Sequence, residues 1–238
     1  MSYRLSALAV CAVFAVASVC QASLGPLQVK IDDNVDPAVV AVDQGDNDGS
    51  DIDGVVLLTA ATTNWLSTVS TGISEPAIGS TTVPAMDLNS VNVTSLGNPG
   101  TLKVSLTGKY NPNDPAIPGF IHSIGGTTQG EIGTQLFWGT SAFDEDILLS
   151  EMTPTLSGSG PSFIFSEQTT TIPTAEGTAD DDYWLTLVAY VEHTGSGPQT
   201  TSFNAAVDSA PIPEPASIAI WTLMAGIGGL IWMRRRSK

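Results

Sequence analysis

Short stretches of alternating apolar and polar residues dominate the chain between Val55 and Val207. In segments 102–106 and 185–191 an apolar side chain recurs at every second position, as a half-buried antiparallel sheet requires. Clusters of Gly, Pro, Asn and Ser separate these stretches, and helical periodicity is hard to find before Ala216. The pattern therefore predicts an all-β domain.

Nine segments between turn signals fit short strands. They are Gly54–Ala60, Asn64–Thr71, Met86–Ser95, Gly100–Tyr110, Gly119–Thr128, Glu131–Ser141, Ser162–Thr171, Asp182–His193 and Gln199–Val207. One open sheet of this size would leave an apolar face uncovered, so we expect an antiparallel β-sandwich over residues 23–207. A jelly-roll and an immunoglobulin-like sandwich both satisfy this pattern, and the strand spacing leaves the choice open.

The N-terminal segment has the order of a secretory signal. Arg4 precedes an apolar run from Leu5 to Val19, and small residues follow up to Ala22. This order of charge, short apolar core and small-residue site predicts a signal peptide over residues 1–22. We therefore expect the chain to be exported.

The C-terminal segment predicts a membrane anchor. Residues 208–215 form a proline-rich linker, and Ala216–Met233 carries no charge. As a helix this segment would span about 27 Å, close to the ~30 Å of a bilayer core. The basic tail, residues 234–238, marks the cytoplasmic end by the positive-inside rule, which leaves the domain on the outer side.

Pro213, Glu214 and Pro215 stand directly before this apolar segment, and Arg234, Arg235 and Arg236 follow it. Together with the signal peptide, this order resembles the PEP-CTERM sorting signal. The resemblance implies that an exosortase, a membrane-embedded processing enzyme of exopolysaccharide-producing bacteria, recognises Pro213, Glu214 and Pro215. The body also resembles a recurrent group of such proteins at 36–39, 86–93 and 100–106. This second resemblance supports sorting and says nothing about a ligand or catalysis.

The resemblance implies a sequence of locations. The chain would be held in the inner membrane by its helix, and then processed to the cell surface or the extracellular matrix. The leading hypothesis is accordingly a non-enzymatic structural or adhesive protein, with exopolysaccharide as a candidate partner.

Charge and cysteine content narrow the partners. Both cysteines lie within the predicted signal peptide, so the exported chain would contain no disulfide or thiolate site. All 24 acidic residues lie between Lys30 and Glu214. This range contains three lysines and no arginine, so its formal charge is 3 − 24 = −21. This charge makes nucleic acid and anionic surfaces poor binding partners. Divalent cations, cationic surfaces and neutral sugars are the candidate partners.

One glycine-rich loop concentrates carboxylates. Calcium takes six to eight oxygen ligands from such loops. The candidate ligands are Asp43, Asp46, Asp48, Asp51 and Asp53. The spacing departs from an EF-hand. Counted from Asp46 as the first ligand, Asp51 stands at the sixth position, where glycine is required, and Leu57 at the twelfth, where glutamate is required. A solvated acidic loop is the alternative to a calcium site.

Aromatic residues on predicted strands suggest a second hypothesis, a calcium-supported carbohydrate-binding module. Trp65 and Trp138 are the candidate ligand-binding residues, because flat aromatic faces stack on sugar rings. Packing in the core explains both tryptophans equally well.

Catalytic patterns are weak, and we predict no catalytic residue. Acidic pairs occur in Asp180–Asp182 and Asp144–Glu151, but such pairs are expected by chance in a chain with 24 acids. His122 and His193 each lie within a strand-like stretch, where a core or strand-face histidine is favoured over a metal ligand. A glycoside hydrolase is therefore the weakest of the hypotheses.

Overall fold

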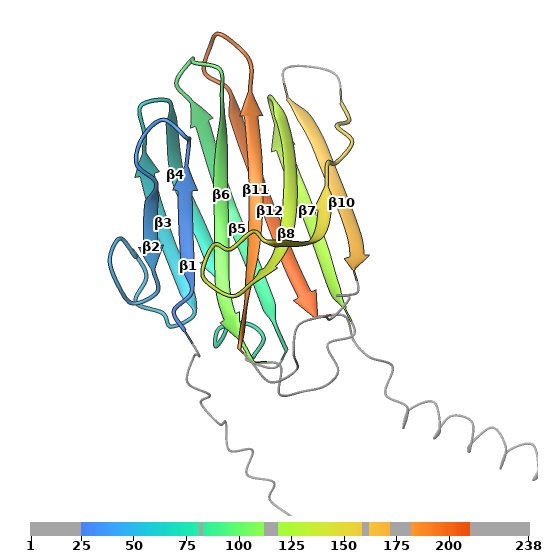
Figure 1. Cartoon of the computed structure of the whole chain (residues 1–238). Helices are drawn as coiled ribbons and strands as arrows, with labels where there is room; N and C mark the ends of the chain where they lie inside the picture. Colours follow the sequence, from blue (N-terminus) through green and yellow to red (C-terminus); the bar gives the residue numbers. More distant parts are fainter. Residues whose placement is uncertain (1–24, 81–82, 112–118, 159–161, 172–181, 210–238) are drawn as a thin grey trace, which may run out of the picture.

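The computed structural model of the chain describes residues 25–80, 83–111, 119–158, 162–171 and 182–209 (Figure 1). The predicted signal peptide, the Pro-Glu-Pro motif, the C-terminal apolar segment and the basic tail lie outside these residues. Within them, no helix is long and apolar enough to cross a membrane. The described residues form the domain between the two predicted ends.

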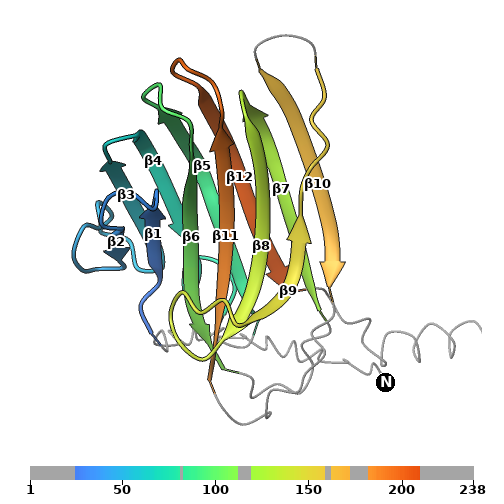
Figure 2. The same cartoon turned by 45° about the horizontal axis from the view of Figure 1, so that its top comes forward.

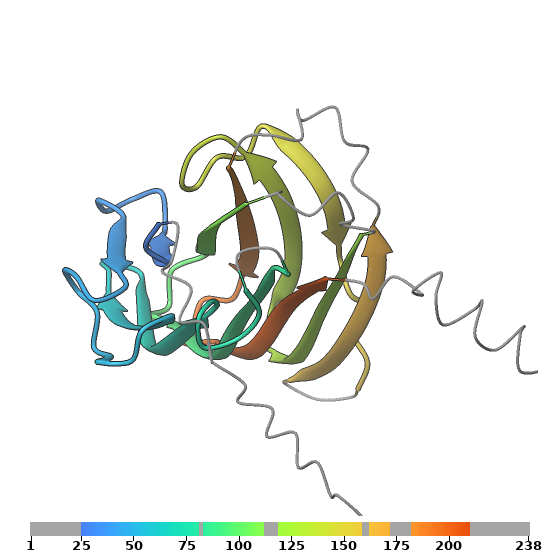
Figure 3. The same ribbon diagram turned by 90° about the horizontal axis from the view of Figure 1, so that it is seen from below.

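Twelve strands form two antiparallel sheets that face each other (Figures 1, 2 and 3). Sheet A has the order β2 (Val39–Val42), β1 (Gln28–Asp32), β6 (Gly100–Tyr110), β11 (Tyr183–His193), β8 (Glu131–Gly139) and β9 (Ile147–Met152). Sheet B has the order β10 (Phe163–Thr171), β7 (Phe120–Thr128), β12 (Thr200–Ser209), β5 (Ala85–Ser95), β4 (Trp65–Ile73) and β3 (Val55–Ala61). The prediction of an all-β sandwich is confirmed.

The pairing of the strands identifies a jelly-roll topology. Strand β5 pairs with β12, β6 with β11, β7 with β10 and β8 with β9. The second half of this region therefore runs back along the first half in reverse order, and successive pairs alternate between the sheets, as in a double-sheet jelly roll. At one edge, β1 and β2 extend sheet A, and β3 and β4 extend sheet B.

All nine predicted strands are present, and the structure adds three more. The additional strands are β1, β2 and β9. All three are short. In β9, Ile147 and Leu148 are both exposed, so this strand lacks the alternation of buried apolar and exposed polar residues that predicts a strand. Strand β12 also continues to Ser209, two residues into the predicted linker, where Asp208 pairs with Ala85 and Ser209 with Phe120.

Alternate side chains of both sheets fill one apolar core. Its largest fully buried members include Trp65, Tyr110, Phe120 and Phe203. The Tyr110 hydroxyl lies 2.5 Å from Ser74 Oγ, which in turn donates to the Ala85 carbonyl at 2.9 Å. Burial of a polar group is tolerated when it is hydrogen-bonded in this way.

Both histidines belong to this core, as the sequence predicted. His193 is fully buried, its Nε2 lies 2.9 Å from Thr201 Oγ1, and its ring is 4.7 Å from that of Trp65. His122 is also fully buried, with Nδ1 3.1 Å from Ser150 Oγ. Burial lowers the pKa of each histidine from 6.5 to about 4, because the charged imidazolium is poorly solvated there.

The buried histidines predict a loss of stability in acid. Between pH 6.5 and about 4 the unfolded chain binds protons that the native histidines do not. The free energy of unfolding should therefore fall as the pH is lowered through this window, by up to about 1.4 kcal/mol per pH unit for each histidine. We expect His193→Gln and His122→Gln each to flatten this slope in urea titrations at several pH values. Slopes unchanged in both variants would contradict the assignment.

Candidate functional site

A connection between β8 and β9, residues 140–146, crosses the outer face of sheet A (Figures 1 and 2). We call this segment the strap. The Phe143 backbone N–H donates to Thr107 Oγ1 at 3.4 Å, and Lys30 Nζ lies 4.5 Å from the centre of the Phe143 ring. Within the strap, Asp144 accepts hydrogen bonds from the backbone N–H groups of Thr140 and Asp146, which lower the pKa of its carboxyl group. The strap is thus held on β6 and β1.

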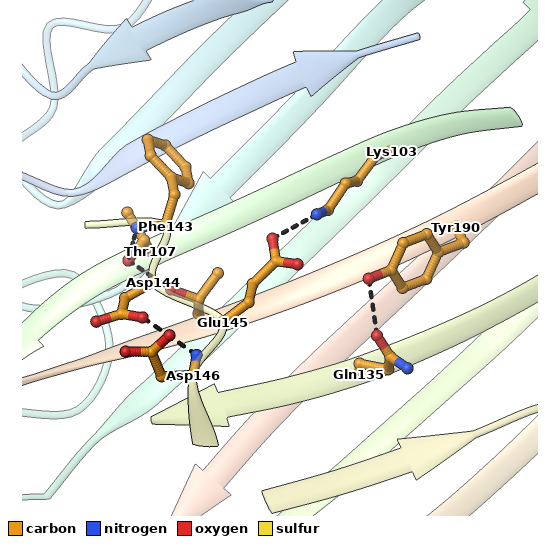
Figure 4. Close-up of polar contacts among 9 residues, drawn as sticks. Lys103, Thr107, Gln135, Phe143, Asp144, Glu145, Asp146 and Tyr190 are labelled. Carbon is orange, nitrogen blue, oxygen red and sulfur yellow. Dashed lines mark hydrogen bonds and ion pairs between the residues drawn. The ribbon is translucent and has the colours of Figure 1, made fainter. Parts of the chain in front are cut away.

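Beside the strap, five side chains form a connected polar cluster around Tyr190. Figure 4 shows Lys103, Glu145, Tyr190 and Gln135 of this cluster. Lys103 forms an ion pair with Glu145 of the strap, and its Nζ lies 5.6 Å from the centre of the Tyr190 ring. The Tyr190 hydroxyl donates to Gln135 Oε1 at 2.7 Å. Gln135 Nε2 then donates to Glu151 Oε1 at 2.8 Å. These contacts hold the half-buried Tyr190 ring in a defined position.

Burial and two nearby carboxylates, Glu145 and Glu151, raise the pKa of Tyr190 to about 12. The phenol therefore stays protonated at neutral pH. The protonated hydroxyl donates a hydrogen bond to Gln135. The ring carries no charge, which suits a surface for stacking.

Tyr190 is one of the residues that line a depression of about 190 Å³. In the register of β11 and β8, Tyr190 lies opposite Gly133, which contributes no side chain and leaves space beside the ring. A Cβ atom at Gly133 would lie 3.2 Å from the Met152 carbonyl oxygen, so a larger residue would crowd β9. The outward-facing residues that line the depression are Thr101, Glu131, Gly133, Glu151, Thr153, Tyr190 and Glu192.

The depression lies at the end of the sandwich remote from both ends of the described domain. Glu131 begins β8, and Glu192 is next to the last residue of β11. At the opposite end, Gly25 lies close to Lys109, and Ser209 pairs with Phe120, the first residue of β7. The chain therefore enters and leaves the domain far from this site (Figure 1).

The predicted ligand-binding tryptophans lie elsewhere. Trp65 is only 1% exposed and packs in the core against His193, so it has no free face for a sugar ring in this structure. Trp138 is half-buried, and its ring stacks on that of Tyr183 with centres 3.8 Å apart. Core packing, the alternative weighed for both residues, describes these positions.

In the acidic loop, Asp48 binds backbone groups. Its Oδ1 accepts hydrogen bonds from the Ser50 and Leu57 N–H groups, both at 2.9 Å, and its Oδ2 accepts one from Gln44 N–H at 3.1 Å. The Gly49 N–H also donates to the Leu57 carbonyl at 2.8 Å. The loop therefore covers the free edge of β3, where unpaired strand groups would otherwise be exposed.

Asp43 differs from the other acids of the loop. It is buried, its Oδ2 accepts a hydrogen bond from Gly54 N–H at 2.9 Å, and its Oδ1 has no hydrogen-bond partner among the described residues. Burial, together with the carboxylates of Asp53 and Asp48, raises the pKa of Asp43. Across the described ranges, no three His, Cys, Asp or Glu side chains are grouped closely enough to hold a metal ion.

The Tyr190 cluster was missed by sequence reasoning, although a signal for it exists. Tyr190 lies in a predicted strand, on the face that alternates with Leu185, Leu187 and Ala189. An aromatic residue on the polar face of an amphipathic strand points away from the core, so its position in the sequence marks it as a candidate surface aromatic. The contribution of Gln135 and Glu151 depends on the register of β8 with β11 and β9, which the sequence does not specify.

Comparison with known proteins found no matching family model and no matching curated protein. Two solved structures are similar to the chain, each at 12% sequence identity. One is of carbohydrate-binding modules from the β-sandwich superfamily, with a TM-score of 0.32 over 78% of this chain and 73% of that chain. The other is a carbohydrate-binding module that recognises mannan, with a TM-score of 0.27 over 65% of this chain and 99% of that chain.

The environment of Asp43 predicts that Asp43→Asn stabilises the domain at neutral pH. The substitution removes a buried charge next to two like charges, while the amide oxygen can still accept from Gly54 N–H. Because the native pKa is raised above 3.8, the gain should vanish as the pH falls below 3.8. We expect a rise in Tm of a few degrees at pH 7 in chelator, measured by circular dichroism; a fall in Tm would contradict it.

The same measurement tests the calcium hypothesis. If Asp43 is a calcium ligand, added calcium should raise the Tm of the unsubstituted chain and leave that of Asp43→Asn unchanged. Equal responses of the two proteins to calcium would remove Asp43 from the candidate ligands.

Proposed function

We propose that this protein is a non-enzymatic, polysaccharide-binding domain of the cell surface or extracellular matrix. The depression beside the Tyr190 ring is the observation that supports this function most directly. Sugar rings present an apolar face and a rim of hydroxyl groups. A site for them therefore combines an aromatic surface with fixed hydrogen-bonding groups.

The residues around the depression match both requirements. The Tyr190 ring is fixed by its hydrogen bond to Gln135, so little conformational freedom would be lost on binding. Glu131, Glu151 and Glu192 supply carboxylate oxygens that can accept hydrogen bonds from sugar hydroxyls.

The position of the depression suits an attached protein. Both ends of the described domain lie at the opposite end of the sandwich (Figure 1). In a chain attached to a membrane or surface through its C-terminal segment, the depression would face away from the attachment point, toward surrounding polysaccharide.

Substitution at Tyr190 tests the proposal. Tyr190→Ala removes the ring and should weaken polysaccharide binding roughly tenfold. Tyr190→Phe keeps the ring and loses only the hydrogen bond to Gln135, so it should bind more tightly than Tyr190→Ala. We would measure binding by isothermal titration calorimetry with neutral, acidic and amino-sugar oligosaccharides.

Thr71→Ala, on the outer face of sheet B, is the control and should bind as the unsubstituted chain does. If no member of the panel binds, or if Tyr190→Ala binds unchanged, polysaccharide binding at this site is refuted.

We also propose that an exosortase sorts the protein through its C-terminal segment. The order of Pro213, Glu214 and Pro215, the apolar segment and Arg234–Arg236 supports this second proposal. In addition, the last described strand ends at Ser209, so a cut near the motif would leave all twelve strands uncut.

Mass spectrometry of the protein from cells with an active exosortase tests the sorting proposal. We expect the mature chain to lack the apolar segment and the arginines, and Glu214→Ala to retain them. Asp208→Asn, a few residues upstream, is the matched control and should be processed normally. An intact C-terminal peptide in the mature, unsubstituted protein would refute processing.

A further inference from the structure

Three glutamates line the depression beside Tyr190, and none of them forms an ion pair within the described residues. Glu192 on β11 lies directly opposite Glu131 on β8 in the register of sheet A. Side chains at such positions have Cβ atoms about 5 Å apart, and like charges placed there are destabilising. Glu151 adds a third carboxylate from β9.

The three lysines of the described domain contact groups other than these glutamates. Lys30 lies over Phe143, and Lys109 Nζ lies 2.8 Å from Asp182 Oδ2. Lys103 lies over the Tyr190 ring, but its ion pair is with Glu145 of the strap. All four arginines of the chain lie outside the described residues. Within the described residues, no lysine or arginine therefore forms an ion pair with Glu131 or Glu192.

We infer that the Tyr190 depression binds a cationic amino-sugar polymer, in which protonated amino groups lie against Glu131 and Glu192 while a sugar ring stacks on Tyr190. The inference rests on the proposed polysaccharide-binding function and specifies its substrate class. Two features of the site support it jointly.

The first feature is relief of repulsion. A ligand ammonium group between Glu131 and Glu192 would turn a repulsive cross-strand pair into two favourable ion pairs. The second feature is the aromatic ring beside them, because an ammonium-bearing sugar gains both ring stacking and attraction to the π face. A polyuronate offers the same ring geometry but would place its carboxylates against three glutamates.

Oligosaccharides that differ only in the amino group test the inference. Binding of β-linked glucosamine oligomers and of fully N-acetylated oligomers of the same length would be measured with the full-length chain in detergent, at weakly acidic pH. A polyuronate oligomer is the third probe. We expect the glucosamine oligomer to bind more tightly than the acetylated one, and the polyuronate to show no binding. The preference should shrink with added salt, because exposed charges are screened.

Two neutralising substitutions locate the charges. Glu131→Gln and Glu192→Gln should each reduce affinity for the glucosamine oligomer by about threefold, and leave affinity for the acetylated oligomer unchanged. Glu167→Gln, on β10 of sheet B, makes the same charge change away from the site and should have no effect. Circular dichroism melting shows that each variant is folded.

The possible outcomes separate this inference from the proposed function. Equal binding of both oligomers, weakened in Tyr190→Ala, would overturn the cationic preference and retain polysaccharide binding. A preference that persists in the Glu131→Gln, Glu192→Gln double variant would also overturn the inference, because the selecting charges would lie elsewhere. Absence of binding to every probe would overturn both.

Discussion

The reverse-order pairing of two halves of the chain is the constraint on which the rest of the structure depends. Strands β5 to β8 pair with β12 to β9, so residues far apart in sequence become neighbours in both sheets. Packing of the two inner faces then stabilises the domain, since the described residues contain no cysteine. Polar groups inside are accommodated by hydrogen bonds, such as the one between His193 of sheet A and Thr201 of sheet B.

The strap follows from this arrangement. It is the tip of the long paired region, where β8 turns into β9, and it lies on the outer face of sheet A. Its attachment uses two of the three lysines of the described domain, through Phe143 and Glu145. Neither these two lysines nor Lys109 forms an ion pair with the glutamates that line the depression beside Tyr190, so the depression carries three carboxylates without an ion-pair partner among the described residues.

The acidic loop shows how one sequence feature serves a different purpose in the folded domain. A run of aspartates in a glycine-rich loop suggests a calcium site, because the aspartates supply oxygen ligands and the glycines allow the loop to turn around the ion. In the fold, Asp48 accepts three backbone hydrogen bonds and, with Gly49, occupies the free edge of β3. The identity of the residues was evident from the sequence, whereas their hydrogen-bond partners depended on which strand the loop lies beside.

The sequence by itself determined the all-β class, the two-sheet architecture and nine of the twelve strands, because alternation with period two reflects a strand with one buried face. It also determined the negative charge and the absence of cysteine from the domain. Tertiary structure alone decided the jelly-roll order, the burial of Trp65 and the meeting of Tyr190, Gln135 and Glu151. The physical reason is that strand register and sheet order arise from contacts between distant segments, which local periodicity does not encode.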